Sequence, residues 1–228
     1  MCKVLVSGTS SGLGHYLKSR FSADHFQRNL ENRQKTAFIY DLVIHAGFGR
    51  PSNADNPSKF ISSAVDLLQE IRNIPCKNFI FISSIECFKS TSTTYRDAKL
   101  ECEMLLDKEG NSMIIRLPSI YGPNMQQNQI LKIATEKTPV LSLSKNSTFS
   151  LLSYKQIYDF IRLNVNHRGM KTLMSSIVSL SEISKCFSAR PRWGEFNYVT
   201  PIVDSATIID PGLMISNYKN FVKHSILN

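Results

Sequence analysis

The sequence predicts an α/β protein built on a doubly wound parallel sheet, with a shortened first half and a small C-terminal portion. Short apolar runs typical of buried strands alternate with runs of helical periodicity, and this alternation requires crossover connections between parallel strands. The shortening is indicated by the 26 residues 15–40, the only ones between Gly14 and the strand that begins at Asp41. They hold the first helix, a second helical pattern at residues 32–40 and one brief strand near residues 25–29, where such a half has two further strands. We place the main domain at residues 1–123 and the C-terminal portion, partly interleaved with the sheet, at residues 124–228.

The first strand, at residues 3–6, leads into a turn rich in glycine and serine at residues 7–14, and then into a helix. A strand, a glycine turn and a helix in this order are the context in which such glycines indicate dinucleotide binding. Gly8 allows the tight turn, Gly12 lets a diphosphate approach the backbone, and Gly14 lets the helix pack closely on the sheet. The N–H groups and positive end of the helix attract phosphates. The predicted cofactor-binding residues here are Gly8, Ser10, Ser11, Gly12, Leu13 and Gly14.

Three more apolar runs, at residues 41–47, 78–82 and 112–117, are typical of buried strands. Helical patterns at residues 58–72 and 96–106 separate them. Ligands of parallel sheets bind beyond the carboxyl ends of the strands, so we expect the segments at those ends to converge on one crevice. Besides the glycine turn, these segments supply His45, Ala46, Gly47, Ser83, Ser84, Pro118 and Ser119.

After residue 121 the pattern becomes less regular. Helical patterns remain at residues 130–137, 154–164 and 179–187, and residues 207–211 resemble a short strand.

Tyr95 and Lys99 stand four residues apart in the helical run 96–106 or next to it, which places them one turn apart on one helix face. A free tyrosine titrates near 10, so acid–base work at neutral pH requires its pKa to fall by roughly 3 units. One ammonium a few ångströms away, partly removed from water, has an effect of that order. An isolated pair of this kind is usually an ordinary amphipathic helix with an exposed lysine. The glycine turn and the two strand ends around it favour the functional interpretation.

The formal net charge of +9 is unevenly distributed. Residues 1–115 carry 14 basic and 12 acidic side chains, whereas residues 116–228 carry 13 and 6. No two Lys or Arg residues are adjacent, so we expect no nucleic-acid partner. The basic C-terminal portion either attracts a small polyanion or is a solvated basic surface.

The five cysteines, Cys2, Cys76, Cys87, Cys102 and Cys186, are odd in number and form no Cys-x-x-Cys pair. We interpret them as reduced, mostly buried thiols of a cytoplasmic protein, and expect no metal site. The sequence has no apolar run of 18 residues, and the first strand starts at once, so we expect neither membrane association nor a signal peptide.

The usual marker of cofactor choice is absent. No acid stands about 20 residues after the glycines at a clear strand end, where it would bind a ribose hydroxyl. Arg28, helped by Ser10 or Ser11, would instead meet a 2′-phosphate, which favours NADP over NAD. The alternative is that Arg28 is a solvated loop residue.

Five stretches together resemble the extended short-chain dehydrogenase/reductase superfamily, in its nucleotide-sugar-modifying branch, the NAD-dependent epimerase/dehydratase family. The resemblance implies a Rossmann-like fold and covers most of residues 1–125. It is weak beyond residue 125, where Gln156 replaces one acid of the family's acidic pair. The stretches are residues 7–14, 41–47, 79–88, 95–101 (Tyr-Arg-Asp-Ala-Lys-Leu-Glu) and 116–123 (Arg-Leu-Pro-Ser-Ile-Tyr-Gly-Pro).

The resemblance implies that Tyr95 is the proton donor and acceptor at a sugar hydroxyl or keto oxygen. Lys99 lowers the pKa of that tyrosine and holds the nicotinamide ribose, and Ser84 binds the same substrate oxygen. Ser84 is favoured over Ser83 because the family's hydroxyl residue stands four before an aromatic residue, here Phe88. A hydroxyl and a phenol placed in advance stabilise the charge that hydride transfer creates on the oxygen. The substrate-binding residues that we predict are Ser84, Glu86, Tyr121, Arg190 and Arg192.

Several departures from the family pattern limit the assignment. The glycine spacing is that of the compact, single-domain branch, and Ser84 and Tyr95 are only 11 residues apart, about half the usual gap. Ile85-Glu86 replaces the Asp-Glu pair of the dehydratases, which disfavours dehydration.

The sequence thus predicts an NAD(P)-dependent 4-keto reductase or C4 epimerase acting on a nucleotide-linked sugar. The alternative is a non-catalytic or redox-sensing dinucleotide-binding module. Homodimerisation through residues 58–72 and 95–107 is expected from the resemblance.

Overall fold

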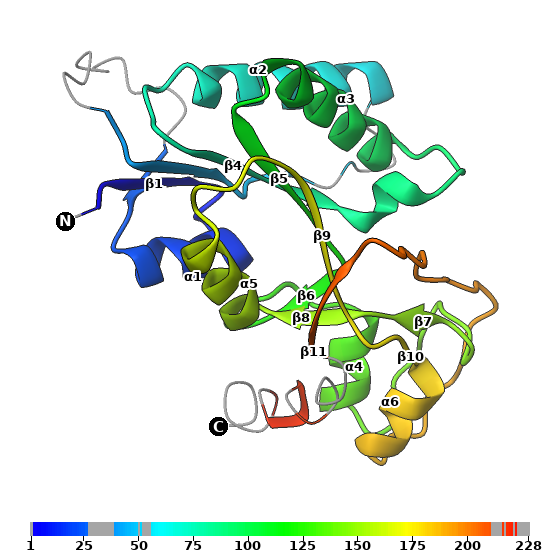
Figure 1. Ribbon diagram of the computed structural model, residues 1–228. Coiled ribbons are helices and arrows are strands. Elements are labelled where there is room, and N and C mark those ends of the chain that lie inside the picture. The colour runs from blue at the N-terminus through cyan, green and yellow to red at the C-terminus, as the bar shows by residue number, and fades with distance from the viewer. Residues whose placement is uncertain are drawn as a thin grey trace.

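The computed structural model describes residues 2–26, 39–49, 51, 56–210, 216, 218–220 and 222. Its main feature is a seven-stranded sheet with the strand order β11-β9-β5-β4-β3-β1-β2 (Figure 1). The strands of this sheet are β1 (Val4–Ser7), β2 (Asp24–His25), β3 (Leu42–His45), β4 (Phe79–Ser84), β5 (Ser112–Leu117), β9 (Gly169–Ser175) and β11 (Thr207–Asp210).

All six strand pairings in this sheet are parallel. The chain therefore has the α/β fold that the alternation of strands and helices predicts. Among the described residues, only the two-residue strand β2 lies beyond β1, which agrees with the short interval after the glycine turn. The division at residue 123 stays a prediction, and both β9 and β11 come from the part of the chain after it.

Helices cover both faces of the sheet, as Figure 1 shows. On one face, α2 (Pro57–Arg72) and α3 (Thr94–Glu109) pack on a core that includes Leu68, Ile71, Phe81 and Leu106. On the other face, α1 (Gly12–Phe21) and α5 (Tyr154–Leu163) pack on a second core. β4 and β5 are almost entirely buried, because helices lie over both of their faces.

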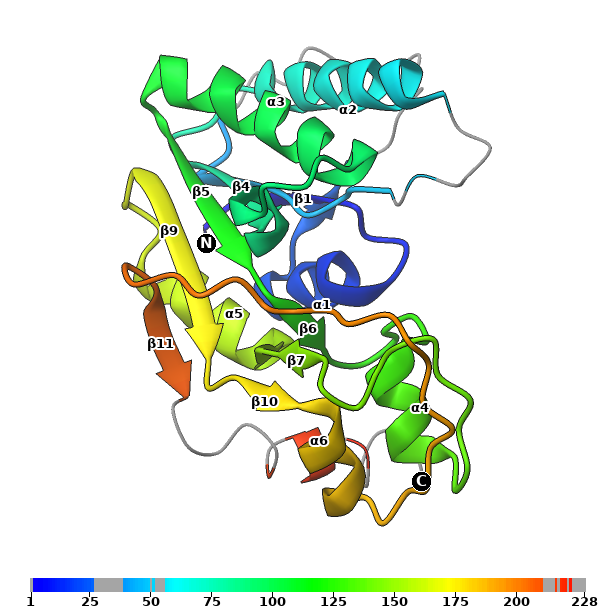
Figure 2. The ribbon, with the colours of Figure 1, turned by 90° about the vertical axis from the view of Figure 1, so that its right-hand side faces the viewer.

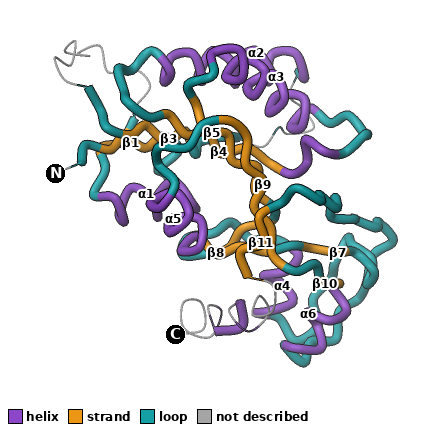
Figure 3. Tube along the Cα trace, in the orientation of Figure 1, coloured by secondary structure: helices purple, strands orange, loops and turns teal. Residues whose placement is uncertain are grey.

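A smaller cluster of elements lies beyond the carboxyl ends of the central strands (Figures 1 and 3). It has its own apolar core, which includes Tyr121, Leu180 and Tyr218. Backbone hydrogen bonds join residues 190–198 to residues 137–148, and Figure 2 shows the returning chain in orange before β11. The elements are β6 (Ser119–Tyr121) paired with β8 (Leu151–Ser153), β7 (Thr148–Phe149) paired with β10 (Val178–Ser179), α4 (Gln129–Thr135) and α6 (Leu180–Cys186).

The glycine turn has the conformation that its residues predict. Gly8 has a φ of +74° and lies against the next strand end, since a Cβ on Gly8 would stand 2.1 Å from the Cα of Gly47. A Cβ on Gly14 would stand 2.1 Å from the carbonyl oxygen of Gly8. Both glycines are thus required so that α1 and the end of β3 can pack against the turn.

The start of α5 has a complete capping box. The hydroxyl of Ser153 accepts from the N–H of Gln156, and the side chain of Gln156 accepts from the N–H of Ser153. Because an uncapped helix end loses a partner for its free N–H groups, Ser153→Ala is expected to lower the free energy of unfolding by about 1 kcal/mol. Urea unfolding checks this, with the exposed Ser62→Ala as a control expected to change it by less than about 0.5 kcal/mol. An equal effect of both substitutions would contradict the capping argument.

No helix among the described residues is at once long enough and apolar enough to cross a membrane. All five cysteines are free thiols, of which Cys87 and Cys102 are buried.

Candidate active site

Parallel pairing brings the carboxyl ends of four strands to one edge of the sheet. β1, β3, β4 and β5 are consecutive neighbours, and the register places Ser7 beside His45 and Ser84 beside Leu117. Every one of these strands runs into a segment that the sequence analysis assigns to a ligand site. The strand ends therefore meet at one edge, whereas the crevice itself and the roles of the individual residues stay predictions.

One face of α3 carries the charged and phenolic groups that approach this edge. Tyr95, Lys99 and Glu103 follow each other at intervals of four residues, so they lie on the same side of the helix. Lys99 and Glu103 are buried, with 2% and 3% of their surface exposed. The helix begins where it does because the hydroxyl of Thr93 accepts from the N–H of Arg96.

The amine of Lys99 lies in an aromatic enclosure. Its Nζ donates to the carbonyl oxygen of Ile82 over 2.7 Å. It also lies 3.7 Å from the ring centre of Phe48, 4.7 Å from that of Phe81 and 5.8 Å from that of Tyr95. Among the residues that the structure describes, no carboxylate forms an ion pair with it. Burial lowers the pKa of Lys99 from its usual 10.5 to about 7.

A second buried charge on α3 does have its partner. Arg116 of β5 donates to Glu103 from Nε over 3.0 Å and from Nη2 over 2.5 Å, and Ser83 donates to the same carboxylate over 2.5 Å. The register of the sheet explains the cluster, because Ser83 and Arg116 are paired neighbours on β4 and β5. The hydroxyl of Ser83, which the sequence predicts to contact a cofactor, therefore donates to the buried Glu103 carboxylate instead.

Ser84 stands at the last position of β4, next to the short helix η1 (Ile85–Phe88). Its hydroxyl accepts from the N–H of Glu86 over 3.2 Å, so the oxygen is fixed at the strand end and keeps its proton for another acceptor. Glu86 itself accepts from the hydroxyl of Tyr198 over 2.6 Å and pairs with Lys89 over 3.0 Å. To bind a substrate as predicted, the Glu86 carboxylate would have to give up its contacts with Tyr198 and Lys89 or bind the substrate in addition to them.

His45 is buried, and its Nδ1 lies 2.6 Å from the hydroxyl oxygen of Ser7. Its Nε2 has no hydrogen-bond partner among the described residues. Burial first, and the nearby charge of Lys99 second, lower the pKa of His45 from 6.5 to about 3. The ring is therefore neutral at pH 7, and its hydrogen bond with Ser7 joins the end of β3 to the end of β1.

Acid is expected to destabilise the protein through His45. The unfolded chain binds a proton near pH 6.5 whereas the folded chain does not until about pH 3, so stability falls as the pH falls through this window. Between pH 7 and pH 5 the wild type should lose about 2 kcal/mol more than His45→Phe. Urea unfolding at each pH measures the difference. Equal pH slopes in the two proteins would contradict the burial of a neutral ring.

The glycine turn faces the C-terminal portion of the chain. The N–H of Gly12 donates to the carbonyl oxygen of Asn124 over 3.2 Å, and a Cβ on Gly12 would stand 3.3 Å from the hydroxyl of Tyr154. The N–H of Gly12 is thus already occupied, which the sequence did not reveal. Ser10 and Ser11 are exposed, and Ser11 is the N-cap of α1 without a side-chain cap bond.

The remaining predicted residues are more scattered. Pro118 and Ser119 follow β5 directly, at the strand-end edge. Tyr121 is buried in the smaller core with its ring 4.9 Å from that of Tyr218, so its role at a substrate stays a prediction. Arg190 and Arg192 are exposed and lie in the stretch hydrogen-bonded to residues 137–139. Arg28 lies outside the described residues.

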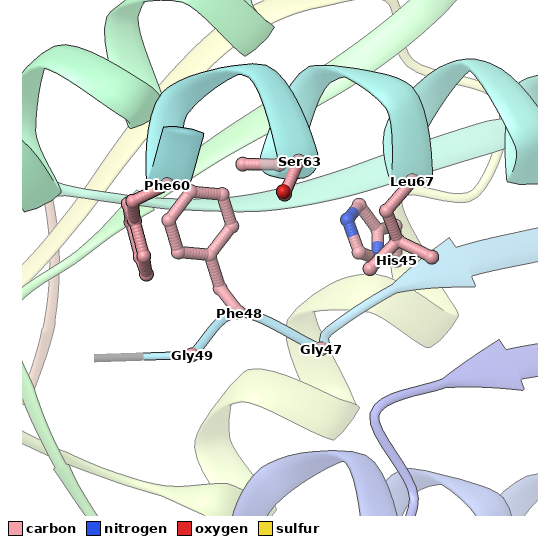
Figure 4. A pocket seen from close by; sticks show the side chains of 8 residues that line it. His45, Gly47, Phe48, Gly49, Phe60, Ser63 and Leu67 are labelled. Carbon is pink, nitrogen blue, oxygen red and sulfur yellow. The ribbon is translucent and has the colours of Figure 1, made fainter. Parts of the chain in front are cut away.

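A cavity of about 170 Å³ opens between the end of β3 and α2 (Figure 4). Figure 4 shows the rings of Phe48 and Phe60 side by side along one wall, and His45 and Leu67 across from them. Ser63 lies between the two sides. Phe48 and Phe60 are not among the site residues that the sequence predicts, because nothing in their spacing distinguishes them from ordinary core positions. The lining residues are His45, Gly47, Phe48, Gly49, Phe60, Ser63, Ala64 and Leu67.

Solved structures with a similar fold include nucleotide-sugar epimerases and a protein solved with NADPH. UDP-N-acetylglucosamine 4-epimerase from Methanobrevibacter ruminantium M1, in complex with UDP-N-acetylmuramic acid, aligns with a TM-score of 0.74 at 14% identity, over 97% of each chain. Helicobacter pylori ADP-L-glycero-D-manno-heptose-6-epimerase has a TM-score of 0.75 at 12% identity, over 97% of this chain and 96% of the other. RMD from Pseudomonas aeruginosa, complexed with NADPH, has a TM-score of 0.71 at 14% identity, over 97% and 96%.

A scan against protein-family models finds no match, and a search of curated proteins finds none either. The structural likeness, which extends over nearly the whole of each chain, establishes the class of fold: a Rossmann-type α/β sheet. More specifically, it is the fold of the solved UDP-N-acetylglucosamine 4-epimerase, ADP-L-glycero-D-manno-heptose-6-epimerase and UDP-galactose 4-epimerase. This agrees with the resemblance of the five sequence stretches.

Proposed function

We propose that this protein is an NAD(P)-dependent oxidoreductase acting on a nucleotide-linked sugar, as a 4-keto reductase or a C4 epimerase. The observation that carries the proposal is the buried amine of Lys99, one turn from Tyr95 at the carboxyl edge of the sheet. A fall in pKa from 10.5 to about 7 means that burying the charged form costs on the order of 5 kcal/mol at acidic pH. A cost of that size at the strand ends, without a carboxylate ion pair in the described residues, is typical of functional sites.

Each residue of the trio has a chemical task that its position supports. The phenol of Tyr95 transfers a proton to or from the sugar oxygen, and Lys99 next to it stabilises the phenolate form. The hydroxyl of Ser84, held at the end of β4, donates to the same oxygen while charge develops there. The nicotinamide, when bound, supplies or accepts the hydride.

The residues present fit a dinucleotide at this edge. The glycine turn leads into the N-terminus of α1, where a diphosphate would replace the carbonyl oxygen of Asn124 at the N–H of Gly12 and lie beside the hydroxyl of Tyr154. Lys99 would hold the nicotinamide ribose once its contact with Phe48 is released. Whether the nucleotide is NAD or NADP depends on residues such as Arg28, and the sequence favours NADP.

The substrate would lie over the smaller cluster of elements. Its diphosphate would meet the basic surface of the C-terminal portion, which includes the exposed Arg190 and Arg192. Glu86 stands two residues after Ser84 and donates its N–H to the Ser84 hydroxyl, and its carboxylate accepts from Tyr198. Glu86 and Tyr198 would border the sugar.

The alternative, a non-catalytic dinucleotide-binding module, is favoured by the aromatic cover of Lys99. The retention of Ser84, Tyr95 and Lys99 at one edge argues for the enzyme. A redox-sensing role finds little support, because burial raises the pKa of Cys87 to about 11 and that of Cys102 to about 12. Thiols that stay protonated react slowly with oxidants.

Dinucleotide binding and turnover test the proposal together. Calorimetry with NADH and NADPH should give saturable binding of at least one of them. Incubation with a panel of nucleotide-linked 4-keto sugars should then lower the absorbance at 340 nm if the protein is a reductase. For an epimerase, nucleotide sugars that differ at C4 should interconvert without net cofactor consumption. Binding without turnover of any panel member would favour the non-catalytic module, and no binding of either dinucleotide would overturn the proposal.

A further inference from the structure

The ring of Phe48, in the segment that follows β3, lies over the amine of Lys99. Its ring centre lies 3.7 Å from Nζ of Lys99, and the ring meets that of Tyr95 edge-on at 5.5 Å. Both members of the Tyr95–Lys99 pair therefore touch the same apolar side chain. A ribose hydroxyl cannot approach Nζ of Lys99 from the side that the Phe48 ring covers, because the ring and the ribose cannot occupy the same space.

The surroundings of Phe48 allow its ring to move. Phe48 stands between Gly47 and Gly49, and the side chain is only partly buried. The cavity of about 170 Å³ borders the ring directly, between α2 and the end of β3 (Figure 4). A cavity of about 150 Å³ is large enough to hold a benzene molecule. The space beside Phe48 is thus large enough to receive a phenyl ring.

We infer that Phe48 controls access of the nicotinamide dinucleotide to Lys99, by turning its ring from the amine into the cavity beside Phe60 and Ala64. The inference rests on the proposed function, since it assumes that a dinucleotide binds at this edge. With the ring over Lys99 the site is closed, and with the ring in the cavity the amine can reach a ribose hydroxyl. If the closed form holds about nine molecules in ten, it weakens the apparent affinity about tenfold.

Two substitutions should move the equilibrium in opposite directions. Phe48→Ala removes the cover, so Lys99 should be modified about tenfold faster by formaldehyde and a borane reductant at pH 9, and the dinucleotide should bind about tenfold more tightly. Ala64→Leu fills the space that the ring would enter, so the modification rate of Lys99 and the affinity for the dinucleotide should both fall below those of wild type. Phe60→Ala enlarges the same cavity without touching Lys99 and is not expected to raise the modification rate of Lys99 as Phe48→Ala does. Mass spectrometry follows Lys99, with the exposed Lys155 as internal standard.

The outcomes separate this inference from the proposed function. Unchanged labelling of Lys99 in Phe48→Ala shows that the ring does not cover the amine and overturns the inference. Faster labelling combined with equal dinucleotide affinities also overturns it, while leaving the proposed function intact. Absence of dinucleotide binding in both wild type and Phe48→Ala removes the proposed function, and the role of Phe48 with it. Faster labelling, tighter binding and the opposite response of Ala64→Leu support it.

Discussion

Tyr95→Phe is expected to lower kcat by about 10²- to 10⁴-fold, the usual contribution of a positioned acid–base group. The substitution removes only the hydroxyl, so the edge-on contact between this ring and Phe48, at 5.5 Å, remains. The helix face that carries Lys99 and Glu103 is also kept. Dinucleotide affinity should therefore stay within about threefold of wild type, because Lys99 rather than the phenol is expected to hold the ribose. Steady-state kinetics and calorimetry on the same preparations measure both quantities.

A matched control is available on the opposite face of the sheet. Tyr158 of α5 packs against Phe21, with the ring centres 4.8 Å apart, so Tyr158→Phe also removes one hydroxyl from a partly buried ring. Its kcat should equal that of wild type. Turnover that persists in Tyr95→Phe would remove the proposed acid–base role, whereas equal losses in the two variants would indicate a general effect on folding.

Glu103→Ala is expected to lower the free energy of unfolding by about 3–5 kcal/mol. The guanidinium of Arg116 would stay buried without its carboxylate, and the hydroxyl of Ser83 would lose its acceptor. Arg116 and Ser83 are both buried, so water compensates little. Urea unfolding measures the change.

Two comparisons show whether the loss arises from the unpaired charge. The double variant Glu103→Leu, Arg116→Met replaces the whole pair by apolar groups and should recover most of the stability. The exposed pair Lys155–Asp159 on α5 serves as the reference, and Lys155→Ala should cost less than about 0.5 kcal/mol. A loss in Glu103→Ala as small as that of Lys155→Ala would contradict the burial of this network.

The local part of the site could be predicted because short-range rules govern it. The order of strand, glycine turn and helix predicts the tight packing of Gly8 and Gly14, and the structure shows it. The interval of four residues predicts that Tyr95 and Lys99 share a face of α3. The alternation of elements predicts the parallel sheet, whose strand ends then have to meet at one edge.

The contacts that change the chemistry depend on long-range packing, which spacing does not encode. The ring of Phe48 lies beside Lys99, 51 positions later in the chain, only because β3 and β4 are neighbours. Glu86 and Tyr198 are separated by 112 residues, and the carbonyl of Asn124 accepts from the N–H of Gly12, 112 residues earlier in the chain. The register of β4 and β5 likewise places Ser83 beside Arg116, and the packing of α3 on these strands brings Glu103 to both. Such contacts require the folded arrangement.

A crystal structure of the protein with NADPH or NADH tests the central claim most directly. The account predicts the diphosphate at the N-terminus of α1 beside Gly8, and the nicotinamide ribose within hydrogen-bond distance of Nζ of Lys99. It also predicts the Phe48 ring away from that amine. The claim would be contradicted by a dinucleotide bound elsewhere on the molecule, or by one bound at this edge while Lys99 remains enclosed by Phe48 and bonded to the carbonyl of Ile82.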